Sequence, residues 1–167
     1  MTIETERLIL KPISPEYIDD IFSNFTEEVT VHMFPQPTGK KEDTKAFVRK
    51  SMKENYEGTN MQMVVLKKDT GEFLGNAGLH DITKRDPELG IWIKRSAHGN
   101  KYGFEAIEAL VKWARKNLIY DYIKYPVVKE NIASRKIPEA LGAKVAREFI
   151  GKNARGEPMD EVEYHIV

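Results

Sequence analysis

The sequence predicts a single α+β (α/β mixed) domain, residues 1–167, in which one mixed sheet packs against helices. Hydrophobic residues make up 41% of the 167-residue chain and charged residues 31%, which is the composition of a globular protein. No internal repeat, low-complexity tract or Gly/Ser linker divides the sequence, so its elements are expected to share one core. Strand-like and helix-like segments alternate along the chain, an order typical of a mixed sheet with helices.

The first part of the chain predicts one strand and two helices. Arg7–Lys11 is a short strand candidate. Ser14–Glu16 supplies an N-cap, a proline at the first helical position and an acidic residue in the first turn, so a helix is expected over Pro15–Phe25. Prolines interrupt residues 34–39, because proline lacks an amide donor and restricts the preceding residue. A second helix is expected over Glu42–Tyr56.

The middle of the chain predicts three consecutive antiparallel strands. Met61–Lys67 and Phe73–Leu79 are apolar stretches separated by the turn signal Asp69–Gly71, which indicates a hairpin. Asp86-Pro87 makes another turn, and Glu88–Arg95 then places Ile91 and Ile93 on one face of a third strand.

An amphipathic helix is expected over Gly103–Asn117, where apolar side chains recur on one stripe. Tyr122–Val128 predicts a strand, and Asn131–Leu141 predicts a short helix that Gly142 ends in a left-handed cap. The stripe of the long helix consists of Phe104, Ile107, Leu110, Val111 and Ala114.

Two strands are expected at the end of the chain, over Lys144–Ile150 and Val162–Val167. A loop through Gly151 and Gly156 is expected to join them. The elements together indicate a mixed sheet.

Composition excludes several classes of function. Lys plus Arg and Asp plus Glu each number 26, so the net charge is zero, which argues against a protein that coats nucleic acid through positive charge. Tyr120, Tyr122 and Tyr125 are expected to be core and strand residues, not a platform for bases. The chain has no cysteine, so disulfides, thiolate nucleophiles and cysteine zinc sites are excluded.

The sequence also argues against two further classes, metalloproteins and membrane proteins. His32, His98 and His165 show neither the spacing nor the companion ligands of a metal site, so no metal is expected. No apolar run approaches the roughly 18 residues of a membrane span. Met1–Lys11 carries acids instead of a basic stretch before an apolar one. We therefore expect a full-length cytoplasmic protein that binds no membrane.

The segment Arg95–Gly103, between a predicted strand and a predicted helix, carries the chemistry. Such a loop points backbone N–H groups at one spot beside a helix N-terminus, which attracts phosphate. Arg95, His98 and Lys101 add positive side chains there, although the chain as a whole is neutral. The phosphate-binding patterns GxxxxGK[ST] and GxGxxG are both absent. The alternative is a glycine-containing turn that leaves its charges in solvent.

Three motifs resemble one enzyme family. ELGIW at Glu88–Trp92, HGNKYGFEA at His98–Ala106 and NIASRKIPEALG at Asn131–Gly142 are similar to the GNAT superfamily of N-acetyltransferases, in its RimJ/RimL-like branch. The opening TERLILKPIS and the proline-rich loop near Pro35 resemble that branch as well. The resemblance therefore covers nearly the whole chain.

The resemblance implies the GNAT fold, a central and mostly antiparallel sheet that is splayed into a V, with acetyl-CoA bound in the opening as co-substrate. Pantetheine would pair with Trp92 and Ile93, and Asn131 would hold it from the other side. A free strand N–H around Ile91–Ile93 would bind the thioester oxygen. The diphosphate would lie on the backbone amides of His98, Gly99, Asn100, Lys101, Tyr102 and Gly103.

The chain departs from the family pattern at two loop positions. His98 stands where Gln or Arg is usual, and Lys101 stands where the family has a central glycine. A lysine forced to positive φ costs roughly 1 to 2 kcal/mol. Either the loop relaxes and the Lys101 ammonium pairs with phosphate, or cofactor binding is weakened or lost.

Ser134 is the expected proton donor to the thiolate, because it matches the serine that the RimL-like branch places beside the sulfur. Pro138 occupies the position where many relatives have a tyrosine. Because proline cannot donate to the Ser134 carbonyl, the helix is expected to be kinked or short. Glu88 is the preferred base, and His80 is the alternative.

The sequence therefore predicts an acetyl-CoA-dependent N-acetyltransferase that acts on the α-amino group of a protein or peptide. The acceptor site is expected between the first two helices, residues 34–39 and the final hairpin. A small amine is the alternative acceptor, and a non-catalytic acyl-CoA-binding module is the alternative class. A homodimer is compatible with each of these.

Overall fold

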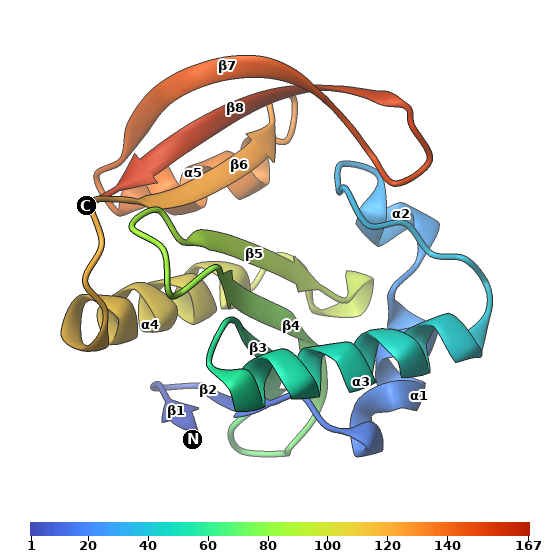
Figure 1. Ribbon diagram of the computed structural model, residues 1–167. Coiled ribbons are helices and arrows are strands. Elements are labelled where there is room, and N and C mark those ends of the chain that lie inside the picture. Colours follow the sequence, from blue (N-terminus) through green and yellow to red (C-terminus); the bar gives the residue numbers. More distant parts are fainter.

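The computed structural model describes all 167 residues, which form one eight-stranded sheet with helices on both faces (Figure 1). The strand order is β1-β2-β3-β4-β5-β6-β8-β7. The strands are β1 (Ile3–Glu4), β2 (Leu8–Pro12), β3 (Met61–Lys67), β4 (Phe73–His80), β5 (Glu88–Ile93), β6 (Ile123–Val128), β7 (Lys144–Lys152) and β8 (Pro158–Ile166). The helices are α1 (Ile18–Asn24), α2 (Glu27–Thr30), α3 (Lys41–Glu57), α4 (Tyr102–Asn117) and α5 (Ile132–Ala140).

The sheet changes character between β5 and β6. Every other neighbouring pair of strands is antiparallel, as the predicted β3–β4–β5 meander requires. β5 and β6 are parallel and share a single register pair, Glu88 with Lys124. The two strands therefore meet at one end only, and the sheet opens beyond Glu88.

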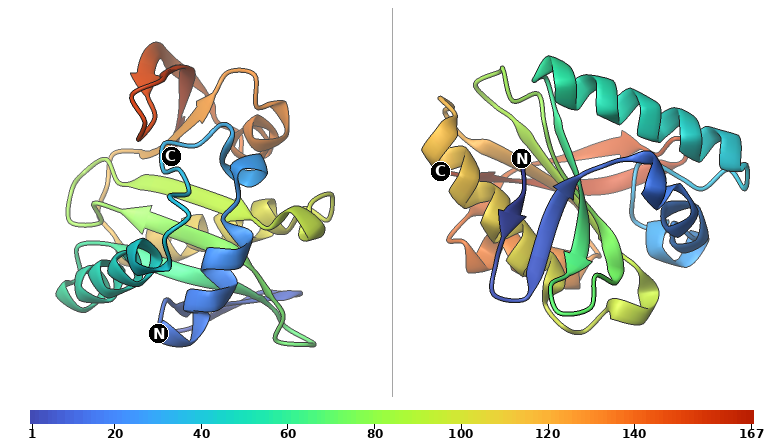
Figure 2. Two further views of the ribbon diagram at one scale, coloured as in Figure 1. Left: turned by 90° about the vertical axis from the view of Figure 1, so that its right-hand side faces the viewer. Right: turned by 90° about the horizontal axis from the view of Figure 1, so that it is seen from below.

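Each face of the sheet has its own hydrophobic core, because successive side chains of a strand point to opposite faces. On β3, Met63 and Val65 pack in the cluster that includes α4, while Val64 and Leu66 pack in the cluster that includes α1 and α3. Figure 2 shows α3 and α4 on opposite sides of the sheet. The apolar character of β3 on both faces is thereby explained.

The helices follow the predicted segments with two additions. The first helix is preceded by a 3₁₀ turn at Pro15–Tyr17. The short helix α2 was absent from the predicted elements, and the Thr26 side chain caps it by accepting a hydrogen bond from the Val29 amide. Gly142 follows α5 with φ of 82°, which confirms the left-handed cap.

Three predicted strand boundaries are wrong by two residues or more. The last strand begins at Pro158, four residues before the predicted Val162. The strand expected to reach Arg95 ends at Ile93, because Arg95–Ala97 forms a 3₁₀ turn. Gly151 belongs to β7 and pairs with Met159, so the connecting loop runs only through residues 153–157.

The tip of the β7–β8 hairpin reaches the segment that joins α2 to α3 (Figure 1). The Ala154 amide donates to the Phe34 carbonyl over 2.8 Å, and the Arg155 guanidinium donates to the Pro37 carbonyl over 3.0 Å. Arg155 also pairs with Glu27 of α2. These contacts hold residues 34–37 over the face of the sheet that packs against α1 and α3. None of the helices could span a lipid bilayer.

Candidate functional site

The opening between β5 and β6 exposes one edge of the β5 backbone. The Lys124 amide donates to the Pro87 carbonyl over 2.8 Å where the strands meet, and no further pair joins them. The Lys94 amide donates to Leu74 of β4. Because backbone direction alternates along a strand, Trp92 turns its amide toward β4, whereas Ile91 and Ile93 turn theirs toward the opening.

This alternation revises the expected contact of pantetheine with Trp92 and Ile93. The Trp92 backbone is engaged by β4, where it pairs with Asn76. Ile93 does face the opening, and Ile91 is the second residue on that edge. The Trp92 side chain instead belongs to the core under α1 and α3.

The loop before α4 presents six consecutive backbone amides without a carbonyl partner, those of residues 99–104. Of the expected set, the His98 amide is excluded because it donates to the Arg95 carbonyl over 3.2 Å and closes the 3₁₀ turn. Gly99 and Lys101 both have positive φ, of 84° and 61°. This turning of the chain and the N-terminus of a 16-residue helix make an anion-binding geometry.

The side chains around this loop differ from the expected cluster of three cations. Arg95 pairs with Glu28 over 2.6 Å, and His98 Nε2 lies 2.6 Å from the Ile93 carbonyl oxygen. The Asn100 side-chain amide donates to the Ala97 carbonyl over 3.1 Å and braces the loop. The Lys101 ammonium forms no ion pair or hydrogen bond, so it is the free positive charge beside these amides.

Asn131 and Ser134 lie together at the start of α5. The Asn131 side-chain oxygen accepts a hydrogen bond of 3.3 Å from the Ser134 amide. The Asn131 amide group, Nδ2, has no partner in the protein and remains available to a ligand. Gly103 of α4 is close to this helix, because a Cβ built there would lie 3.4 Å from Cδ1 of Ile137.

Tyr125 of β6 is hydrogen-bonded to Ser134. Its hydroxyl lies 2.7 Å from Ser134 Oγ and 3.2 Å from the Ser134 carbonyl oxygen. Pro138 is accommodated within α5 but cannot bond that carbonyl, so the Tyr125 hydroxyl takes the place of the missing donor. Burial raises the pKa of Tyr125 to about 12, which keeps its hydroxyl protonated at neutral pH.

A cavity of about 610 Å³ lies on the opposite face of the sheet, under the segment that the β7–β8 hairpin holds. Its outer wall combines apolar side chains with polar ones between Gln36 and Thr44, and its inner wall is the surface of β3, β4 and β5. The inner wall carries four polar side chains, none of which forms a hydrogen bond or ion pair with another protein group. The outer wall includes Phe22, Phe25, Met33, Phe34, Pro35 and Phe47. The four polar residues are Gln62, Asn76, His80 and Glu88.

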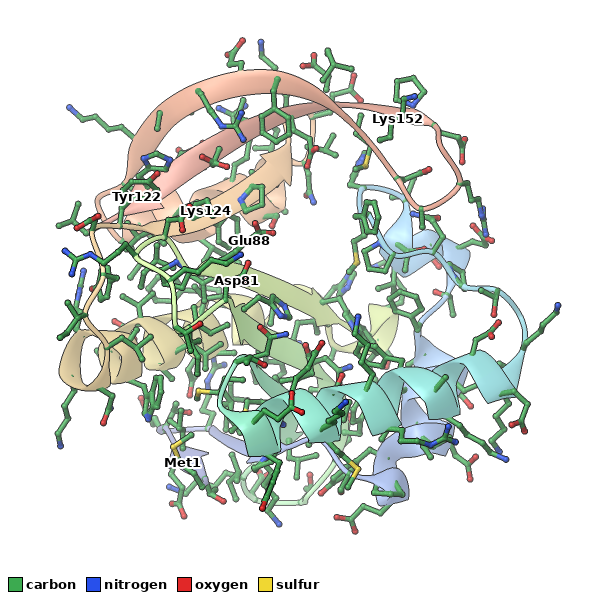
Figure 3. All side chains as sticks on the ribbon, in the orientation of Figure 1. Met1, Asp81, Glu88, Tyr122, Lys124 and Lys152 are labelled. Carbon is green, nitrogen blue, oxygen red and sulfur yellow. The ribbon has the colours of Figure 1, made fainter.

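Glu88 and His80 are a cross-strand pair at the mouth of this cavity. Figure 3 shows Glu88 near Lys124, where β5 and β6 separate. The Lys124 ammonium donates to Asp86 over 3.1 Å, and the Glu88 carboxyl forms no hydrogen bond or ion pair. Burial raises the pKa of Glu88 and lowers the pKa of His80. His80 is therefore neutral near pH 7 and able to accept a proton.

Sequence reasoning missed the roles open to Gln62, Asn76 and Tyr125. Tyr125 was expected only as a core residue, and it is 2% exposed. Gln62 and Asn76 interrupt the apolar runs of β3 and β4, and a carboxamide inside such a run was the available signal. No group of three or more potential ligands could hold a metal ion.

Comparison with known proteins identifies the fold and the family. A family model described as an acetyltransferase (GNAT) domain matches residues 7–144. The uncharacterized N-acetyltransferase YoaA of Bacillus subtilis (strain 168) is 26% identical over 171 residues, which cover 99% of this chain and 96% of that protein.

Two solved structures share the fold over their whole length. An acetyltransferase (GNAT family) from Bacillus anthracis has a TM-score of 0.86 at 22% identity, with 100% of this chain and 98% of that chain covered. RimL, a ribosomal L7/L12 alpha-N-protein acetyltransferase in complex with coenzyme A, has a TM-score of 0.87 at 15% identity, with the same coverage. The splayed sheet is thus the GNAT fold. Since the family model spans the loop before α4 and the start of α5, this chain belongs to the GNAT acetyltransferase family and is an acyltransferase enzyme.

Proposed function

We propose that this protein is an acetyl-CoA-dependent N-acetyltransferase that acts on the α-amino group of a protein or peptide. One observation carries the proposal. The sheet opens between β5 and β6, with the free amides of residues 99–104 and the Ser134 hydroxyl on the side of α4 and α5, and with Glu88 and His80 in the cavity on the other face. An acyl donor and an amine acceptor can therefore meet in the opening from opposite sides.

The residues of the α4 side fit coenzyme A. Its diphosphate would accept hydrogen bonds from the amides of residues 99–104, with the Lys101 ammonium as counter-charge. The backbone of Ile91 and Ile93 would pair with pantetheine as an added strand does. The Asn131 Nδ2 group would donate to the same arm. Acetyl-CoA would supply the activated acetyl group.

Each proton has an assigned place in the transfer. Glu88 or neutral His80 would take the proton of the acceptor amine, directly or through water. A β5 amide that faces the opening, Ile91 or Ile93, would bind the thioester oxygen as negative charge develops on it. Ser134 would give its proton to the departing thiolate and take up the second proton that the amine nitrogen loses, so no alkoxide is left. The Tyr125 hydroxyl would hold Ser134 Oγ in position.

The α-amino group of a peptide is favoured as acceptor by the shape of the cavity. The apolar side chains of its outer wall suit the side chains of a peptide end. Among the lining residues, Asp43 and Glu88 are the only carboxylates, so the cavity lacks the acidic lining that a polyamine would favour. RimL, which acts on a ribosomal protein, shares the fold.

The proposal is tested by titration with acetyl-CoA, followed by thiol release in the presence of separate pools of peptides and small amines. We expect binding of acetyl-CoA and thiol release with the peptide pool. Binding without release from any pool would support the non-catalytic module. Release with small amines alone would assign the other acceptor class.

Replacement of Lys101 by glycine is expected to raise the stability of the protein and to lower its affinity for coenzyme A. Glycine removes the cost of a left-handed lysine, so the free energy of unfolding should rise by about 1 kcal/mol. The lost ammonium should weaken binding of coenzyme A by about tenfold at low salt, and by less at high salt. Urea unfolding and titration at two salt concentrations measure the two effects.

Lys101→Asn is the matched control, because asparagine tolerates positive φ and carries no charge. It should lose affinity as the glycine variant does. Unchanged affinity of both variants at low salt would show that Lys101 does not contact the phosphates.

The partly buried Glu88 carboxyl predicts a pH-dependent stability. Since its pKa is raised in the folded state, the folded protein binds this proton more tightly than the unfolded chain does. The wild type should therefore lose stability as the pH rises above about 4.3, the ordinary value for glutamate. Glu88→Gln has no such loss, so its advantage in urea midpoint should grow from pH 4 to pH 8.

His80→Gln is the control, because its urea midpoint relative to the wild type should change with pH in the opposite direction. The pKa of His80 is lowered in the folded state, so the wild type gains stability as the pH rises toward about 6.5. The relative midpoint of His80→Gln should therefore fall over that range. A Glu88→Gln midpoint that tracked the wild type at every pH would contradict the burial of this carboxyl.

A further inference from the structure

The strongest unexplained feature of the molecule is the side chain of Asn76. The residue is 2% exposed, and both polar atoms of its carboxamide lack any hydrogen-bond partner. They are the only buried side-chain nitrogen or oxygen atoms in this condition. A buried and unpaired polar group destabilises a fold. Asn76 lines the acceptor cavity, so the partner it lacks can come from a bound molecule.

Gln62 is a second carboxamide on the same wall. It is 8% exposed, and its side chain forms no hydrogen bond with the protein. Gln62 pairs with Gly78 across β3 and β4, and Asn76 lies two residues from Gly78 on the same face. Gln62 and Asn76 are thus diagonal neighbours, at a separation of about 7 to 8 Å.

Gly78 keeps this wall open to polar groups. A Cβ built on Gly78 would lie 2.8 Å from His80 Nε2 and 2.9 Å from Gln62 Oε1. The absence of a side chain there lets the imidazole and the carboxamide lie against the strand surface. The proton acceptor His80 and the two carboxamides are therefore grouped on one wall.

The chemistry of two carboxamides indicates their ligand. A carboxamide offers one acceptor oxygen and two N–H donors, which complement the N–H and C=O of a peptide group. Alternate peptide groups of an extended chain repeat at about 6.6 Å, close to the separation of a diagonal pair. Lys40 is the only lysine or arginine among the lining residues, so a phosphate or carboxylate ligand would find few positive charges there.

We propose that Asn76 and Gln62 recognise two alternate peptide groups of an extended acceptor whose α-amine lies at the opening beside Glu88. This inference rests on the proposed acetyl transfer, and it narrows the acceptor to a chain of at least three residues. Across the strands and along them together, the backbone of Gln62 lies about 12 Å from that of Glu88 and the backbone of Asn76 about 14 Å from it. With the reach of the carboxamide side chains, an extended chain of about three residues covers these spans. Asn76 turns its covered polar atoms into the cavity as the peptide binds.

The test compares three acceptors that share the group around the amine: isopropylamine, alaninamide and trialanine amide. For each enzyme, the selectivity is the kcat/KM for trialanine amide divided by the kcat/KM for isopropylamine. Asn76→Leu keeps the branching of the side chain and removes its polar atoms, and it should lower the selectivity by about 10- to 100-fold. Gln62→Met, a second variant of similar size, should lower it in the same direction.

The thermal stability of the Asn76 variant distinguishes a role in peptide recognition from a structural role. Asn76→Leu removes an unpaired polar group, so its Tm should rise by a few degrees. Asn117→Leu is the control, because Asn117 is an exposed carboxamide at the far end of α4 that donates to the Trp113 carbonyl. The control should leave the selectivity unchanged. If Asn76→Leu instead fails to fold, Gln62→Met carries the test.

A second readout, calorimetric titration of trialanine amide in the presence of coenzyme A, separates this inference from the proposed function. Peptide binding that Asn76→Leu weakens about tenfold supports recognition, even if the wild type transfers no acetyl group and the proposed function fails. Acetyl transfer by the wild type with unchanged selectivity in both variants would overturn the inference alone. A wild type that neither binds nor acetylates trialanine amide would overturn it as well.

Discussion

Replacement of Gly103 by glutamate is expected to abolish binding of acetyl-CoA. Gly103 is the second residue of α4 and lies among the free amides of residues 99–104. A glutamate there puts a carboxylate where the diphosphate would sit, and the carboxylate can accept hydrogen bonds from the same amides. Loss of charge-assisted bonds and added repulsion predict an affinity at least about 100-fold lower.

The fold is expected to survive this substitution. Acidic side chains stabilise the first turn of a helix, so α4 gains from the change. The new Cβ would lie 3.4 Å from Ile137 Cδ1 and 3.8 Å from Ile91 and Ile93, which are tolerable contacts. Calorimetric titration with acetyl-CoA measures the affinity, and circular dichroism checks the fold.

Gly103→Ala is the matched control, because it adds the same Cβ without the carboxylate. Its affinity should stay within about tenfold of the wild type. A folded Gly103→Glu protein that bound acetyl-CoA as the wild type does would show that the diphosphate lies elsewhere.

Replacement of Ser134 by alanine is expected to reduce kcat by about 100-fold or more, the usual contribution of a positioned general acid. The dissociation constant of acetyl-CoA should change by less than about threefold, because the residues that would hold the diphosphate are intact. The helix should remain folded, since the Tyr125 hydroxyl can still donate to the carbonyl of residue 134. Thiol release and calorimetry give the two quantities.

Tyr125→Phe tests the positioning of Ser134. This variant leaves the serine hydroxyl free to rotate, so kcat should fall by less than in Ser134→Ala. It also leaves the Ser134 carbonyl without a hydrogen-bond donor, because Pro138 has no amide hydrogen. The unfolding free energy should therefore fall by about 1 to 3 kcal/mol. Ser134→Thr keeps a hydroxyl and should retain more turnover than Ser134→Ala. An undiminished kcat in Ser134→Ala would assign the proton to another donor.

Local signals in the sequence were sufficient for most elements. The apolar stripe of α4 and the apolar runs of β3 and β4 report which residues are buried, because side-chain periodicity follows the backbone geometry. The loop before α4 was recognised by its glycines and its place between strand and helix. The family resemblance added the V-shaped sheet, which the fold confirms.

Local sequence signals could not predict contacts between residues that are distant in the chain. The amides of Ile91 and Ile93 face the opening, and that of Trp92 does not, because β4 takes every second backbone group of β5. The pairing of Tyr125 with Ser134 depends on how α5 lies against β6.

The sequence by itself determined the order of elements, the two-faced burial of the central strands, the position of the candidate phosphate-binding loop and the family. The tertiary structure alone decided which backbone amides are free and which carboxamides lie unpaired in the cavity beneath residues 34–40. The physical reason is that periodicity reports the face on which a side chain lies, whereas hydrogen-bond satisfaction depends on partners that folding brings from elsewhere in the chain.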